Sequence, residues 1–200
     1  MKKLIVIIIA LYTISFDFLS AKTIFIEAEN MDERGGWVID QQSMDQMGSP
    51  YLMAHGLGVP VEDAVKQITI PKSGRYNIWV RTRNWCAPWG AEDAPGKFQL
   101  LINQKSVSPI FGTTGAEWHW QNGGTIELDK GKCKLAIHDL TGFNGRCDAI
   151  ILTSDLQFIP PDNREELDQF RREQLKLSTP QTIAEEFDLV VVGGGMAGIC

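Results

Sequence analysis

Three glycines near the C-terminal end of the chain have the spacing G-x-G-x-x-G, namely Gly193, Gly195 and Gly198. In this pattern the first glycine allows a tight turn from a strand into a helix, and the second lets a pyrophosphate approach the backbone. The third lets the helix pack closely on the strand, and the free N–H groups at the helix start stabilise phosphate charge. The spacing therefore indicates a dinucleotide-binding loop, in which Gly194 and Ala197 also take part.

The run Phe187–Val192, which is apolar except for Asp188, leads directly into this loop. A strand buried on both faces of a parallel sheet requires such a run, whereas a flexible glycine linker does not explain it. We therefore expect residues 185–200 to be the first strand and glycine loop of a Rossmann-like α/β domain. A complete unit needs about 30 residues, so we expect the sequence to be the N-terminal part of a longer protein. We expect this part alone not to hold the cofactor.

The N-terminal residues have the organisation of a secretory signal peptide. Lys2 and Lys3 precede the apolar run Leu4–Leu11, and Leu19-Ser20-Ala21 offers small residues for cleavage. A membrane anchor is the alternative, but the apolar run is short for a bilayer. The sequence thus predicts removal of residues 1–21 and a periplasmic or secreted protein without a stable membrane span. Export favours FAD over NAD as the cofactor, because soluble nicotinamides need a cellular pool for recycling.

The composition is that of a globular protein with 44% hydrophobic and 22% charged residues. Its net charge of −6 and the absence of a basic run in the sequence argue against nucleic acid as a partner. Nineteen glycines and nine prolines favour a β-rich domain over a helical bundle.

Residues 22–154 contain successive short segments with strand periodicity, separated by turn signals. In Thr23–Glu29, the alternation places Ile24, Ile26 and Ala28 on one face of the strand and Glu27 and Glu29 on the other. The other expected strands are 64–70, 75–83, 98–102, 125–128, 133–140 and 147–152. We expect residues 129–131 and 141–145 to form hairpin loops. The fold class is therefore mainly β, an antiparallel β-sandwich.

The segment 155–184 is expected to be a connector with one helix. Asn163 is a suitable N-cap, and Glu165 and Glu166 follow in the first turn, where the helix dipole favours negative charge. Leu167 and Phe170 begin a narrow apolar stripe that continues through Leu175 and Leu177, so the helix should pack on its neighbours.

Four cysteines occur, at positions 86, 133, 147 and 200, and the absence of a C-x-x-C motif among them argues against zinc binding. In an exported protein a disulfide between Cys86 and Cys147 or between Cys133 and Cys147 is open, and so is a set of buried free thiols.

At its C-terminal end the chain resembles the exported bacterial FAD-dependent oxidoreductases, through Asp188–Cys200. Segments similar to Tyr76–Trp85 and His138–Phe143 recur in members that carry a β-sandwich ahead of the flavin domain. The resemblance implies flavin redox chemistry, with the reacting atoms on the isoalloxazine beyond Cys200. No catalytic residue is assigned within these 200 residues.

The sandwich itself is similar to galactose-binding-like carbohydrate-binding modules, which are jelly rolls. Those modules often begin with a Glu-Ala-Glu strand and close with an Asp-hydrophobic strand, and the two together hold a structural calcium ion. Glu27, Glu29 and Asp148 match these positions. The resemblance therefore implies a calcium site; the alternative is two solvated glutamates, with Asp148 capping a turn.

Tryptophans and histidines are the remaining candidates for binding. Trp85 and Trp89 flank a loop and are equally suited to stacking on sugar rings or to packing, whereas Trp118 and Trp120 are expected to share a strand face in the core or a domain interface. His55, His119 and His138 have no ligand spacing and are expected to be structural.

Taken together, the sequence predicts the N-terminal part of an exported FAD-dependent oxidoreductase acting on a small-molecule or glycan substrate. The alternatives are a non-catalytic carbohydrate-binding module and an accessory domain of a polysaccharide lyase or hydrolase.

Overall fold

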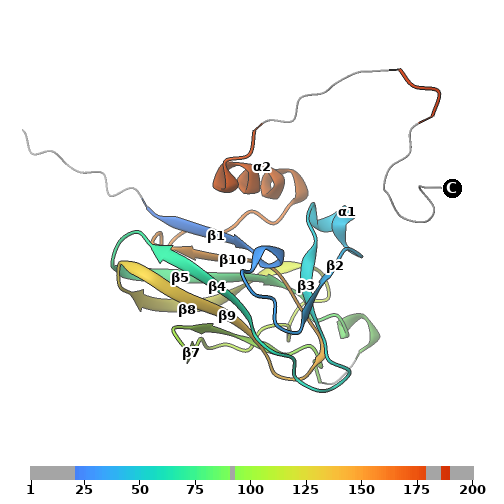
Figure 1. Ribbon diagram of the computed structural model, residues 1–200, viewed down its shortest axis with the longest axis horizontal. Helices are drawn as coiled ribbons and strands as arrows, with labels where there is room; N and C mark the ends of the chain where they lie inside the picture. The colour runs from blue at the N-terminus through green and yellow to red at the C-terminus, as the bar shows by residue number, and fades with distance from the viewer. Residues whose placement is uncertain (1–20, 91–92, 179–185, 190–200) are drawn as a thin grey trace, which may run out of the picture.

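The computed structural model describes residues 21–90, 93–178 and 186–189, and its main body is a sandwich of two antiparallel sheets (Figure 1). The larger sheet has the strand order β2-β3-β10-β5-β8, with β1 also paired to β10. The smaller sheet has the order β4-β9-β6-β7. The strands of the larger sheet are β1 (Thr23–Glu27), β2 (Trp37–Asp40), β3 (Tyr51–His55), β5 (Gly74–Thr82), β8 (His119–Leu128) and β10 (Phe143–Thr153). Those of the smaller sheet are β4 (Ala64–Ile70), β6 (Phe98–Ile102), β7 (Lys105–Ser106) and β9 (Gly131–Asp139).

Strand β10 organises the larger sheet, because β3 and β1 pair successively along one of its edges and β5 pairs along the other. The pairing of β10 with β5 shifts register between Cys147 and Ala149. Asp148 is therefore the additional residue of a β-bulge, a feature that redirects a side chain within a sheet.

The hydrophobic core lies between the two sheets and follows from the alternation of apolar residues along the strands. Ile26, Ile78 and Ile150 face it from the larger sheet, and Leu100 and Ile137 face it from the smaller one. Each of these side chains is almost fully buried. The expected antiparallel β-sandwich is thus confirmed.

The helix α2 (Arg164–Leu175) covers the outer face of the larger sheet, above β1 and β10 (Figure 1). Asn163 is its N-cap and accepts a hydrogen bond from the backbone N–H of Glu166 at 3.0 Å, as the sequence predicts. Leu167 is fully buried against Ala149 and Ile151, which confirms that this helix packs on its neighbours. Leu175 and Leu177, the last residues of the predicted stripe, are exposed.

Several details differ from the sequence-based expectation. The turns at 129–131 and 141–145 are not hairpins, because β8 and β10 belong to the larger sheet and the intervening β9 to the smaller one. The strands β2, β3 and β7 were not expected. The short helical segments are η1 (Ala28–Asn30), α1 (Met44–Met47) and η2 (Ala87–Trp89).

The signal peptide and the glycine loop lie almost entirely outside the described residues, so both remain predictions. Of the apolar strand expected before the loop, only residues 187–189 are described; they carry no strand, and Phe187 and Leu189 are exposed. A strand of that type is stabilised by pairing with neighbouring strands and by helices on both faces. Among the described residues no helix is long and apolar enough to span a membrane.

Candidate functional site

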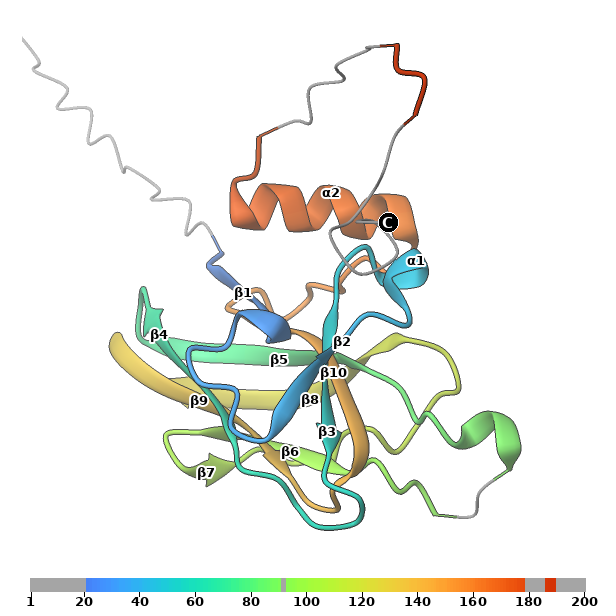
Figure 2. The same ribbon diagram turned by 45° about the vertical axis from the view of Figure 1, so that its right-hand side comes forward.

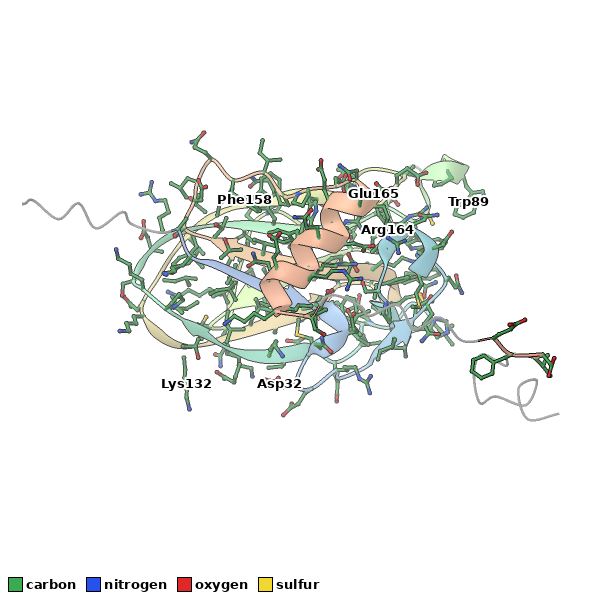
Figure 3. The ribbon with its side chains drawn as sticks, turned by 90° about the horizontal axis from the view of Figure 1, so that it is seen from above. Asp32, Trp89, Lys132, Phe158, Arg164 and Glu165 are labelled. Atoms are coloured by element: carbon green, nitrogen blue, oxygen red, sulfur yellow. The ribbon has the colours of Figure 1, made fainter. Side chains whose placement is uncertain are left out.

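Aromatic and polar side chains gather beside the long connection between β5 and β6, which extends away from the two sheets (Figure 2), and they include residues at the end of β3 and the start of β10. We call this group the loop site, and it consists of His55, Trp85, Trp89, Phe143, Asn144 and Arg146. His55 ends β3, the two tryptophans come from the connection between β5 and β6, and the other three residues begin β10. Trp89 is 74% exposed and projects from the periphery of the molecule (Figure 3).

Trp85 is the centre of the loop site. Its indole Nε1 donates a hydrogen bond to the carbonyl oxygen of Phe143 at 3.0 Å. The guanidinium carbon of Arg146 lies 5.2 Å from the indole ring centroid, within the range of a cation–π interaction. The rings of Trp85 and Trp89 meet edge to face, with centroids 6.1 Å apart. Gly96 packs against Trp85 so closely that a Cβ there would lie 3.0 Å from the ring.

The polar part of the loop site is held by a strained turn. Asn144 adopts a left-handed backbone conformation with φ of 57°, which asparagine tolerates better than most residues. Its Oδ1 lies 3.0 Å from Nδ1 of His55. The site therefore presents an exposed indole, an amide, an imidazole and a guanidinium together, a combination that suits a ligand with both apolar faces and hydroxyl groups.

The loop containing Trp85 and Trp89 is anchored through Asn84, which is buried. The backbone N–H of Asn84 bonds to the carbonyl oxygen of Gly115 at 2.8 Å, and its Oδ1 accepts from the N–H of Cys86 at 3.1 Å. Cys86, Cys133 and Cys147 are free thiols, which agrees with one of the alternatives left open by the sequence.

The three carboxylates singled out in the sequence are brought together beneath α2. We call the group the carboxylate cluster; it consists of Glu27, Glu29 and Asp148 with the guanidinium groups of Arg81 and Arg171. Glu27 and Asp148 are buried, so the alternative of solvated glutamates on an exposed strand does not hold for Glu27. Its side chain points from β1 toward α2, the face opposite to Ile26.

Two arginines form ion pairs with Asp148. Nη2 of Arg171 lies 2.6 Å from Oδ2 of Asp148, and Nη1 of Arg81 lies 3.3 Å from the same oxygen. Arg81 also contacts Asp162 at 3.3 Å, whose side chain is half exposed. Neither arginine was recognised from the sequence, although Arg171 lies four residues after Leu167 and hence on the apolar stripe of its helix.

Burial alters the acidity of the cluster. It raises the pKa of Glu27 to about 8, and the nearby Arg171 only partly offsets this. Burial also raises the pKa of Glu29 to about 7 and raises the pKa of Asp148, where Arg171 and Arg81 act in the opposite direction.

These pKa values predict a pH dependence of stability. Because Glu27 and Glu29 bind protons more tightly in the folded than in the unfolded chain, the free energy of unfolding should fall as the pH rises from about 5.5 to about 8.5. Urea denaturation at the two pH values measures the difference. In a Glu27→Gln variant, which mimics the protonated side chain, the free energy of unfolding should fall less over the same pH range. Stability that increases over this range would contradict the burial of these groups.

The remaining candidates of the sequence analysis have structural surroundings. Trp118 and Trp120 are buried as expected, Trp118 directly before β8 and Trp120 within it. Trp118 packs on Tyr51, whereas Trp120 belongs to the apolar cluster under α2. His119 lies 3.0 Å from a backbone carbonyl and His138 lies 2.7 Å from Asp63.

The comparisons with known proteins concern the sandwich. No protein-family model matches the chain, and no curated protein is similar to it in sequence. Among solved structures, it is similar to a Podospora anserina mannanase with a family 35 carbohydrate-binding module, with 18% identity and a TM-score of 0.53 over 69% of this chain. The chain spans 29% of the length of that mannanase.

Two isolated modules match over nearly their whole length. One is a family 35 carbohydrate-binding module from Clostridium thermocellum, with 18% identity and a TM-score of 0.52 over 66% of this chain and 97% of the module. The other is the C-terminal family 6 module of a marine laminarinase from Zobellia galactanivorans, with 18% identity and a TM-score of 0.50 over 66% of this chain and all of the module. The described sandwich therefore has the fold of family 35 and family 6 carbohydrate-binding modules, and these matches give no support to the flavin prediction.

Proposed function

We propose that the sandwich is a glycan-binding module and that the loop site is where the glycan binds. The single observation that supports this most strongly is the exposed indole of Trp89 set against Trp85, with Asn144 and Arg146 beside it. Tryptophan is enriched at interaction surfaces, because its ring combines a large apolar face with a polar N–H group.

The chemistry of the loop site matches that of a sugar. A pyranose ring has an apolar face of C–H groups that packs on an aromatic ring, and hydroxyl groups around its edge that both donate and accept hydrogen bonds. Trp89 offers the aromatic surface, while Asn144 and Arg146 of the same site carry amide and guanidinium groups that can hydrogen-bond to the ring hydroxyls. The fold supports the proposal, because the solved modules that share it are named for binding carbohydrate.

Affinity electrophoresis tests the proposal, in gels that contain β-mannan or laminarin, the polysaccharides suggested by the enzymes that carry the similar modules. The full chain should be retarded in at least one of the two gels. Trp89→Ala should reduce the retardation several-fold, because it removes the exposed stacking surface. The matched control is Ile159→Ala, which removes another highly exposed apolar side chain from a different part of the molecule. Equal retardation of the wild type and Trp89→Ala would place any binding elsewhere.

A second proposal rests on the glycine motif at 193–198, which follows an apolar run. We propose that the glycan-binding module belongs to an exported FAD-dependent oxidoreductase, with the pyrophosphate of FAD at Gly193, Gly194, Gly195, Ala197 and Gly198. The visible absorption spectrum of the protein from the complete reading frame, produced with flavin available, tests this directly. A flavin spectrum that persists through desalting supports it, and a folded protein that cannot be reconstituted with FAD contradicts it.

A further inference from the structure

The carboxylate cluster occupies the position where the resemblance to carbohydrate-binding modules implies a calcium ion, yet its contacts do not suit one. Calcium takes about six to eight oxygen ligands at roughly 2.3–2.6 Å. Oδ2 of Asp148 instead accepts from both arginines, and Oδ1 accepts from Ser49 Oγ at 3.2 Å. In the part of the chain that the structure describes, no group of three or more His, Cys, Asp or Glu side chains is arranged to hold a metal ion.

The side chain of Arg171 lies within the carboxylate cluster and contacts two of its acidic residues. Its Nη2 contacts Asp148 of β10 at 2.6 Å, and its Nε lies 3.3 Å from Oε1 of Glu27 at the end of β1. Its Nη1 donates to the carbonyl oxygen of Met47, the last residue of α1. One guanidinium thus joins the first strand, the last strand and the α1 segment, and Arg171 is only 5% exposed.

The approach of Arg171 is fixed by the packing of α2. Leu167, one turn earlier on the same face, is fully buried. The rings of Phe170 and Phe25 meet edge to face, with their centroids 5.5 Å apart. These contacts seat the helix on the outer face of the larger sheet, so the guanidinium enters the cluster as part of a docked element. The neighbouring Arg172 is exposed.

We propose that the guanidinium of Arg171 takes the place of a structural cation in this sandwich. Docking of α2 and bridging of the strands β1 and β10 are then one event, and the fold is independent of calcium. The oxygens Oε2 of Glu27 and Oε2 of Glu29 are buried without a hydrogen-bond partner among the described residues, and both side chains line a cavity of ≈ 420 Å³ beside Arg171. Removal of the guanidinium would therefore leave carboxylate oxygens around a space into which a calcium ion fits.

The test compares thermal unfolding of the full chain and three variants by near-ultraviolet circular dichroism, in EDTA and in millimolar calcium chloride. Arg171→Met keeps the aliphatic length without the charge, and Arg171→Lys keeps a charge without the planar fork. Arg172→Met is the matched control, one residue away on the same helix.

For the wild type and for Arg172→Met, the proposal predicts that each protein unfolds at the same temperature in EDTA and in calcium chloride. Arg171→Met should unfold about 10 °C lower in EDTA, because a buried carboxylate loses its partner, and calcium should recover part of the loss. The unfolding temperature of Arg171→Lys should lie between those of the wild type and Arg171→Met in EDTA, and calcium should not change it. If Arg171→Met does not fold in EDTA, recovery of its near-ultraviolet signal on addition of calcium supports the proposal in the same way. A wild-type response to calcium, or an Arg171→Met variant that calcium does not restore, overturns the proposal.

Discussion

Replacing Asp148 with alanine is expected to lower the free energy of unfolding by about 3–5 kcal/mol. Asp148 is fully buried, and both Arg81 and Arg171 contact its Oδ2. Removing the carboxylate leaves two buried guanidinium groups without their shared partner, which is far more costly than losing a pair at the surface. Urea denaturation followed by near-ultraviolet circular dichroism measures the change.

The control for Asp148→Ala is Asp162→Ala, which removes the other aspartate bonded to Arg81. The Asp162 side chain is half exposed, so its loss should cost less than about 1 kcal/mol. Equal effects of the two substitutions would show that the buried cluster has no special role in stabilising the sandwich.

Replacing Trp85 with alanine is expected to weaken glycan binding about 30-fold, the effect of losing a tryptophan anchor worth roughly 2 kcal/mol. Trp85 supports Trp89 edge to face and holds Arg146 over its ring, so its removal releases both groups. Isothermal titration with mannan- or laminarin-derived oligosaccharides measures the change.

Trp85→Phe separates the contributions to this effect, because it keeps an aromatic ring but loses the hydrogen bond to Phe143. It should bind more tightly than Trp85→Ala and more weakly than the wild type. Far-ultraviolet circular dichroism of each variant verifies that the sandwich is intact. Unchanged affinity in a folded Trp85→Ala variant would exclude the loop site as the place where the glycan binds.

Alternation of apolar residues predicted most of the strands that line the core, because a strand with one buried face must alternate. It did not predict β2 and β3, although Trp37 and Leu52 of these strands also lie in the core. β2 was missed since its burial does not alternate: Trp37 and Asp40 are buried while Val38 and Ile39 between them are exposed. The turns at 129–131 and 141–145 were misassigned as hairpins because turn residues do not reveal which sheet the next strand joins. That choice depends on packing between sheets, which no local pattern contains.

The sites were predictable to different degrees. Glu27, Glu29 and Asp148 were placed together through the family resemblance, and the structure brings them together. Arg81 and Arg171 could not be assigned as their partners, because the contacts join residues far apart in sequence. For Arg171 a signal existed, since it interrupts the apolar stripe of α2 four residues after Leu167. The role of Arg146 at Trp85 had no such signal, because it depends on the start of β10 meeting the connection between β5 and β6.

A glycan microarray probed with the full chain tests the central claim most directly, with a Trp85→Ala/Trp89→Ala double variant measured in parallel. The account predicts that the wild type binds a defined set of glycans and that the double variant, folded by circular dichroism, binds none of them above background. Failure of the wild type to bind any glycan on a broad array, or equal binding by the double variant, would contradict the assignment of the loop site as a glycan-binding surface.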